Sequence, residues 1–164
     1  MIKTLSKVFF ALYILTLLWL VLFKLSFDIT GILLHHQSQS VNIIPFGDIA
    51  SGSIRELIDN VIVFIPLGLM LGMFWQRINL WRKLAYIALF STTIETLQFV
   101  LAIGATDITD VIANTAGGFI GLAAYDAAAK RMNNKALNGC IVIGGMVLLV
   151  ALLVYRFAFI KVLY

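Results

Sequence analysis

The chain has 164 residues, of which 62% are hydrophobic and only 12% are charged. A water-soluble domain carries about a quarter of its residues as charged side chains, so this balance excludes an ordinary soluble domain. Two prolines exclude a proline-rich disordered chain, and the single cysteine, Cys140, excludes an intramolecular disulfide. The composition predicts an all-α integral membrane protein in which residues 1–164 form a single membrane domain.

Five apolar stretches have the length of a membrane span, for which a helix needs about 20 residues. In chain order they cover residues 6–23, 54–75, 84–103, 108–125 and 137–155. Lys3 and Lys7 precede the first stretch, as they would in a signal peptide, but the following KLSFDITG offers no small-residue cleavage site. We therefore expect the first stretch to be a retained anchor, and about five transmembrane helices in all.

The basic residues of the connecting segments predict the orientation, because cytoplasmic loops are enriched in Lys and Arg. If the N-terminus is cytoplasmic, the inner side collects eight basic residues: Lys3, Lys7, Arg77, Arg82, Lys83, Lys130, Arg131 and Lys135. The outer side then holds four: Lys24, Arg55, Arg156 and Lys161. The bias predicts a C-terminus outside, and it explains the net charge of +4 without a nucleic-acid partner.

The acidic residues show the complementary distribution. In this orientation Asp126 is the one acid on the inner side, and the other seven lie outside or in the outer parts of the spans: Asp28, Asp48, Glu56, Asp59, Glu95, Asp107 and Asp110. Chemistry or binding should therefore face outward.

Polar residues lie inside three of the predicted spans. The capping box at 53–56 fixes the start of the second span, which puts Asn60 roughly 9 Å below its outer end. The same rise puts Glu95 about 12 Å deep in the third span and Asn114 about 10 Å deep in the fourth. These three side chains are expected at nearly one depth.

Helical spacing places further polar and small residues on the same faces. Three stripes result: Ser91, Glu95 and Gln98; Asp107, Asp110, Asn114, Gly117 and Gly121; and Asn60, Phe64, Gly68 and Gly72. Polar side chains avoid lipid, and glycines four residues apart let helices approach closely. We expect a polar cleft facing the outer leaflet, lined by the second, third and fourth spans, with the first and fifth outside it.

Each polar residue also has a purely structural interpretation. Glu95 could be a hydrogen-bonded packing residue, although an ionisable residue at this depth favours function. Asp107 and Asp110 suit the N-cap and first turn of a helix. Asn60, Gln98 and Asn114 could have no role beyond hydrogen bonds between helices. Adjacent histidines at 35–36 lack a third ligand at usable spacing, and we predict neither a metal site nor a cofactor.

Four motifs in order resemble the VanZ-like family, bacterial membrane proteins named for a teicoplanin-resistance protein. They are NIIPF (42–46), NVIVFIPLG (60–68), ETLQ (95–98) and DITDVIANTAGGFIG (107–121), so the resemblance covers residues 42–121, with the spans at 6–23 and 137–155 flanking it. Many members have an arginine shortly before the first aspartate, where this chain reads IGATD. The matching positions are Asn42, Pro45, Phe46, Asn60, Phe64, Pro66, Gly68, Glu95, Gln98, Asp107, Asp110, Asn114, Gly117 and Gly121.

The resemblance and the polar stripes together define the candidate site. The ligand-binding candidates are Asn42, Asn60, Glu95, Gln98, Asp107, Asp110 and Asn114, and the catalytic candidates are Glu95, Asp107 and Asp110. The resemblance implies a multi-pass protein of the bacterial cytoplasmic membrane with a link to teicoplanin resistance. Our leading hypothesis is that it binds a lipoglycopeptide or a lipid-linked cell-wall precursor in the outward cleft and so lowers teicoplanin susceptibility. Alternatives are an intramembrane enzyme that modifies such a precursor, a small transporter or flippase subunit, and a structural scaffold. An oligomer is compatible with each.

Overall fold

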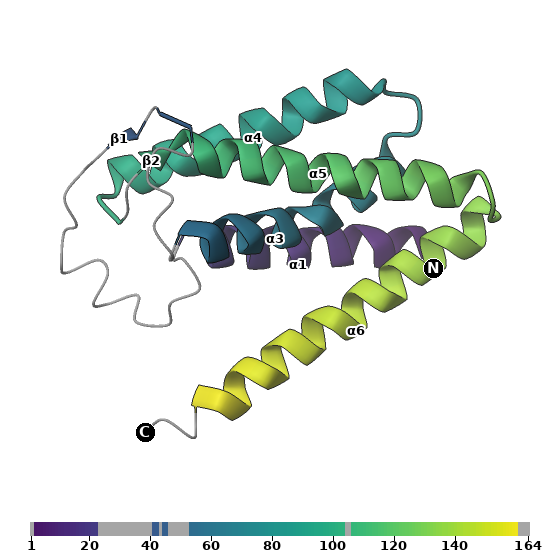
Figure 1. Cartoon of the computed structure of the whole chain (residues 1–164). Helices are drawn as coiled ribbons and strands as arrows, with labels where there is room; N and C mark the ends of the chain where they lie inside the picture. Colours follow the sequence, from purple (N-terminus) through teal and green to yellow (C-terminus); the bar gives the residue numbers. More distant parts are fainter. Residues whose placement is uncertain (1, 23–40, 43, 46–52, 104–105, 161–164) are drawn as a thin grey trace.

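The computed structural model describes residues 2–22, 41–42, 44–45, 53–103 and 106–160 (Figure 1). These residues form α1 (Ile2–Leu22), β1 (Val41–Asn42), α3 (Ser53–Phe74), α4 (Leu80–Val100), β2 (Thr106–Asp107), α5 (Ile108–Ala129) and α6 (Asn134–Ile160). The all-α class predicted from composition is confirmed. The five helices cover the five predicted spans, with ends that differ by a few residues.

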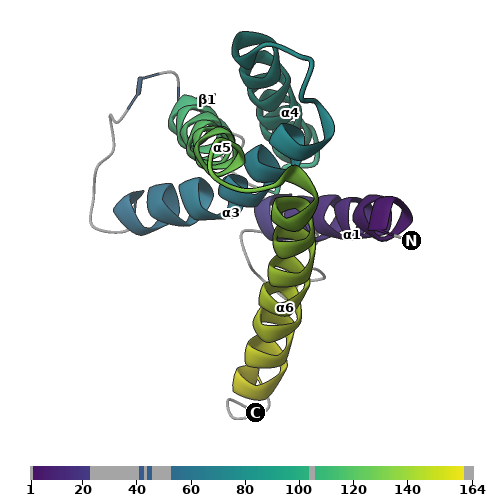
Figure 2. The same cartoon turned by 90° about the vertical axis from the view of Figure 1, so that its right-hand side faces the viewer.

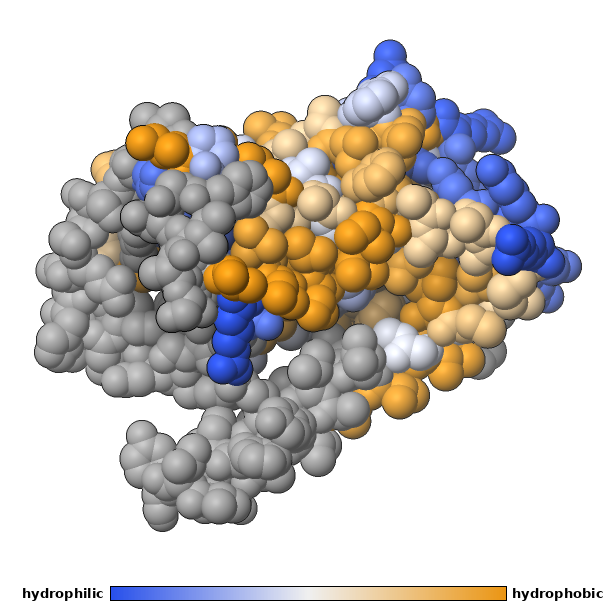
Figure 3. Space-filling model, in the orientation of Figure 1, coloured by the Kyte–Doolittle hydropathy of each residue, from blue (hydrophilic) through white to orange (hydrophobic). Residues whose placement is uncertain are grey.

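The two ends of the helical bundle differ in character. At one end, here called the turn end, lie the N-terminus and the turns at 75–79 and 130–133 (Figure 1). At the other, here called the strand end, β1 and β2 pair in parallel, with Val41 opposite Thr106 and Asn42 opposite Asp107. Hydrophilic residues gather at the turn end, whereas hydrophobic residues cover the middle of the visible face (Figure 3).

Helices α3 and α5 form the closest pair of the bundle. A Cβ atom added at Gly121 would overlap the carbonyl oxygen of Ile65, and one added at Gly68 would overlap that of Gly118. Gly117 lies equally close to the carbonyl oxygen of Val61. The small-residue spacing predicted from sequence is therefore where the two backbones meet, because only glycine permits this separation.

Helix α1 belongs to the hydrophobic core of the bundle. Its buried face carries Phe9, Tyr13, Leu17 and Val21, and Leu17 has no exposed surface. The Tyr13 hydroxyl donates to the carbonyl oxygen of Val63 in α3 at 2.6 Å. Apolar stripes on α1 alone could not reveal this, because lipid and a neighbouring helix both accept an apolar face.

Helix α4 ends earlier than the sequence suggested. Ala102 has φ of 52°, and the amides of Ala102 and Ile103 donate to the carbonyl oxygens of Phe99 and Gln98. These two bonds form a Schellman motif, which stops the helix at Val100 instead of residue 103. Glu95 thus lies only about 7 Å from the helix end, not the 12 Å expected.

Helix α6 diverges from the other four helices after its first turns (Figures 1 and 2). Leu137 and Val142 are buried near its start, and Gly145 faces the ring of Phe9. By contrast, no described side chain or neighbouring helix lies within 4 Å of the place where a Cβ on Gly144 would stand. The fifth span is therefore anchored to the bundle by its N-terminal half, at the turn end.

Many large apolar side chains remain exposed along the helices. Examples on four helices are Leu15 (64%), Ile62 (56%), Leu89 (64%) and Val147 (64%). Within the described residues, two helical segments meet length and hydropathy criteria for crossing a membrane, Thr4–Leu22 with mean hydropathy 2.2 and Ile54–Phe74 with 2.1. That all five helices cross a membrane, and with which orientation, stays a prediction.

Candidate functional site

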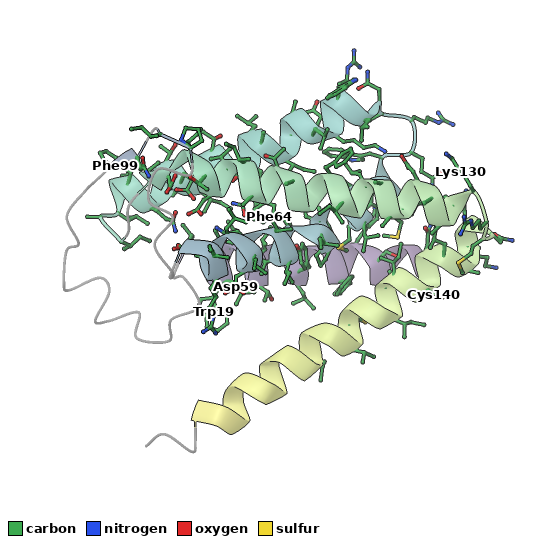
Figure 4. All side chains as sticks on the ribbon, viewed as in Figure 1. Trp19, Asp59, Phe64, Phe99, Lys130 and Cys140 are labelled. Atoms are coloured by element: carbon green, nitrogen blue, oxygen red, sulfur yellow. The ribbon has the colours of Figure 1, made fainter. Side chains whose placement is uncertain are left out.

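Most of the predicted site residues gather at the strand end, where oxygen-bearing side chains from α4, α5 and the strands cluster (Figure 4). Glu95 is central to this group. Its carboxylate accepts from the backbone N–H of Asp107 at 3.1 Å, and its own carbonyl oxygen accepts from the Thr106 hydroxyl at 3.1 Å. Glu95 is only 2% exposed. The end of α4 and the start of α5 are therefore joined through this residue.

Asp107 has an evident structural role. It is the N-cap of α5, and its carboxylate accepts from the backbone N–H of Thr109 at 2.7 Å. The other carboxylate oxygen accepts from the Asn42 side-chain amide at 3.3 Å. The predicted capping function is confirmed for Asp107, and the same side chain holds β1 against β2.

Asp110 lies one turn further along α5 and is 8% exposed. It accepts a hydrogen bond of 2.8 Å from the side-chain amide of Asn60 on α3. An acid in the first turn of a helix also interacts favourably with the N-terminal end of the helix dipole. Asp110 therefore links α3 to α5 at the level of the cluster.

Asn114 forms the deepest part of this group. It has no exposed surface, and its Nδ2 donates to Ser91 Oγ on α4 at 2.8 Å. Ser91 lies four residues before Glu95 on α4, and Asn114 lies four residues after Asp110 on α5. Both residues are therefore about 6 Å deeper along their helices than these acids. The expectation of one common depth is therefore wrong by about one helical turn for Asn114.

Gln98 departs from the predicted arrangement. Its side-chain amide donates to the carbonyl oxygen of Val21 in α1 at 2.9 Å, and the residue is 1% exposed. Gln98 thus faces α1, whereas α3 and α5 were the expected neighbours. The cause is the way α4 packs against α1, which brings Gln98 to the end of that helix.

The cluster is packed, which differs from the open cleft that the sequence predicted. Glu95, Gln98, Asp110 and Asn114 are buried, and Asn42, Asn60 and Asp107 are partly buried. In the part of the chain that the structure describes, no group of three His, Cys, Asp or Glu side chains is arranged to hold a metal ion. The histidines at 35–36 lie outside the described residues.

Two buried acceptor atoms have no hydrogen-bond partner among the described residues, Asn114 Oδ1 and Gln98 Oε1. Leaving a buried polar atom unpaired costs about 1–3 kcal/mol. A buried acceptor without a partner in the protein requires an explanation, such as a donor supplied by ordered water or by a bound group.

Sequence analysis missed a second polar network, at the turn end. The Gln76 amide donates to the Tyr125 hydroxyl at 2.9 Å, and that hydroxyl donates to Asn138 Oδ1 at 3.2 Å. The network joins the turn after α3 to α5 and α6. The helical register of α5 carries a weak signal for it, because Tyr125 lies four residues beyond Gly121 on the same face.

The fold and the cluster define a class of small helical protein, with apolar outer surfaces and buried polar side chains near one end. The family model described as VanZ/LLP1 matches residues 10–129. The chain is also 51% identical over 154 residues to Protein VanZ of Enterococcus faecium, which spans 94% of each chain. The chain therefore belongs to the VanZ/LLP1 family. No solved structure matches it.

Family membership confirms the resemblance found in the motifs, and the match extends beyond residues 42–121 to include much of α1. The two strongly apolar helices and the VanZ relative together suggest a membrane protein.

Proposed function

We propose that this protein crosses the bacterial cytoplasmic membrane five times, with the N-terminus in the cytoplasm, the C-terminus outside and the strand end outward. Exposed basic side chains at the turn end support this orientation: Arg77, Arg82, Lys130, Arg131 and Lys135. Lys130 marks this end in Figure 4, opposite Asp59 and Phe99. The exposed apolar side chains between the two ends suit contact with lipid.

In this orientation the polar cluster binds the head of an amphiphilic, wall-related molecule, and the protein thereby lowers susceptibility to teicoplanin. The observation that carries this proposal is the buried cluster itself, in which Glu95, Asp107 and Asp110 converge from two helices. Buried ionisable groups in membrane helices mark binding sites or pathways by default. The apolar helix faces alongside accommodate an acyl chain, so a lipoglycopeptide or a lipid-linked wall precursor has a suitable form.

The proposal is tested by teicoplanin susceptibility in a sensitive Gram-positive host. The host carries an empty vector, the wild-type protein, Glu95→Gln or Asp126→Asn, with membrane levels compared by blot. Glu95→Gln keeps the side-chain shape and an acceptor for the Asp107 amide but removes the charge. Asp126→Asn is the matched control, because Asp126 is an exposed acid at the turn end of α5.

We expect protection by the wild type and by Asp126→Asn, and loss of protection with Glu95→Gln at equal protein level. Equal protection by all three proteins would assign Glu95 to packing and remove the cluster as the site. Absence of protection by the wild type would refute the link to teicoplanin for this protein.

A further inference from the structure

A buried lysine lies at the turn end, where α4 begins. Lys83 is the fourth residue of α4 and is only 5% exposed. Among the described residues, its ammonium group has neither an ion pair nor a hydrogen bond. Its Nζ is not one of the described side-chain atoms that are fully enclosed without a partner, so this atom reaches the surface. Lys83 is therefore packed along its stem, with its charge open to an anion from outside the protein.

Two arginines add positive charge beside this lysine. Arg82 is exposed, and its backbone N–H donates to Asn79 Oδ1 at 2.9 Å, which fixes the start of α4. Arg77 is exposed in the turn that leads into α4. In the part of the chain that the structure describes, neither arginine takes part in an ion pair, and the same holds for Asp126, the acid at this end. The positive charge is thus not neutralised within the described protein.

An aromatic pair connects the basic residues to the apolar surface. Trp75, which follows α3, and Tyr86 on α4 pack edge to face, with ring centroids 5.2 Å apart. The pair brings the turn that contains Arg77 against the first turns of α4. Tyr86 lies four residues after Arg82 and three after Lys83, so it shares a face of α4 with both. Trp75 is 36% exposed and Tyr86 49%, as suits aromatic side chains at a membrane–water interface.

The exposed face of α4 continues from Tyr86 as an apolar surface. Leu89, one turn further along, is 64% exposed. The exposed threonines at 92, 93 and 96 each donate to the carbonyl oxygen four residues earlier, at 2.8–2.9 Å. Their hydroxyl groups are therefore satisfied without water. This helix lies on the side of the bundle away from α6 (Figure 2), so an acyl chain has room along it.

We propose that the first turns of α4 bind the phosphodiester group of an anionic phospholipid, with Arg77, Arg82 and Lys83 around the phosphate and an acyl chain along the exposed face of α4. A zwitterionic headgroup such as phosphocholine carries a cation that these residues repel. A free phosphate has the charge but no chain for the aromatic pair and the apolar face. The inference goes beyond the proposed function, because it concerns the opposite end of the bundle and requires only that the protein lies in a membrane.

The test uses the full chain in phosphatidylcholine nanodiscs, into which brominated phosphatidylglycerol or brominated phosphatidylcholine is titrated. Bromine on the acyl chains quenches nearby tryptophan fluorescence, and Trp75 and Trp81 are two of the three tryptophans. Trp19→Phe removes the third, which lies near the other end of the bundle, so that the signal reports on the turn end.

In this background, phosphatidylglycerol should quench at a mole fraction at least about tenfold lower than phosphatidylcholine at low ionic strength. Three basic residues carry this preference, because each contributes about fivefold near an anionic lipid before salt screens it. Soluble glycerol phosphate should not relieve the quenching. Relief would identify a site for the free phosphate and overturn the assignment to a lipid.

Lys83→Gln should reduce the preference for phosphatidylglycerol about fivefold. If this variant fails to fold, as judged by thermal unfolding, Arg82→Gln makes the same test at an exposed position. Lys135→Gln is the matched control, because Lys135 is an exposed lysine in the first turn of α6, and it should keep the preference.

Equal quenching by the two brominated lipids in the Trp19→Phe protein would overturn the inference. A loss in Lys135→Gln as large as in the α4 variants would also overturn it, because the whole turn end would then attract lipid without a site on α4. The readout does not involve teicoplanin. Failure here therefore leaves the proposed function standing, and failure of the susceptibility test leaves this inference standing.

Discussion

The close contact between α3 and α5 leads to a prediction about Gly121. In Gly121→Ala, the new methyl group would overlap the carbonyl oxygen of Ile65 and lie 2.8 Å from the backbone nitrogen of Leu69, whereas ordinary contact begins at 3.4 Å. Both neighbours are backbone atoms, so no side-chain rotation can relieve the contact. The two helices must move apart along the seam that also contains Gly68.

The magnitude follows from the cost of overpacking a tightly packed core, about 1–3 kcal/mol. We expect the upper part of this range, about 2–3 kcal/mol, because the neighbours are backbone. Gly144→Ala is the matched control, since its added Cβ would have no described side chain or neighbouring helix within 4 Å. Replacing glycine by alanine inside an exposed helix stabilises by up to about 1 kcal/mol, so this control should be neutral or slightly stabilising.

Thermal unfolding of the purified protein in detergent measures both variants. For a chain of this length, each kcal/mol shifts the Tm by about 2–4 °C, so Gly121→Ala should lower the Tm by about 5–10 °C. Gly144→Ala should leave the Tm unchanged or raise it slightly. If the two variants unfold at the same temperature, the helices do not meet at Gly121 and the packing described here is incorrect.

Three further predictions concern other parts of the fold. Ala102→Gly should raise the free energy of unfolding by about 1 kcal/mol in the same assay, because a left-handed conformation is unfavourable for alanine. As a control, Ala123→Gly, at an exposed position inside α5, should lower the free energy of unfolding by about 1 kcal/mol. Tyr125→Phe should cost about 1 kcal/mol through the lost bonds to Gln76 and Asn138. It should leave teicoplanin susceptibility unchanged, and loss of protection at equal protein level would contradict a site at the strand end. Alkaline phosphatase, which folds only outside the cytoplasm, should be active when fused at the C-terminus and inactive when fused after residue 77; the reverse pattern would refute the orientation.

Several features could be read from the sequence because they depend on local properties of the chain. Five apolar stretches become five helices, since a helix satisfies its backbone hydrogen bonds within one segment whatever the neighbours are. Asp107 caps α5 because an aspartate at the boundary of an apolar run can accept from the first backbone amides. The spacing of Gly117 and Gly121 predicted a close helix contact, which the structure places against α3.

The tertiary structure alone decided which polar groups meet. Periodicity puts Gln98 on the same stripe as Glu95, but the rotation and shift of α4 against its neighbours bring Gln98 to α1. Those two quantities depend on every contact along the interface, and no single helix encodes them. The positive φ of Ala102 likewise ended α4 early and changed the depth of Glu95. Sequence patterns therefore determined the helices and their polar faces, whereas packing between helices determined the partners of each polar side chain.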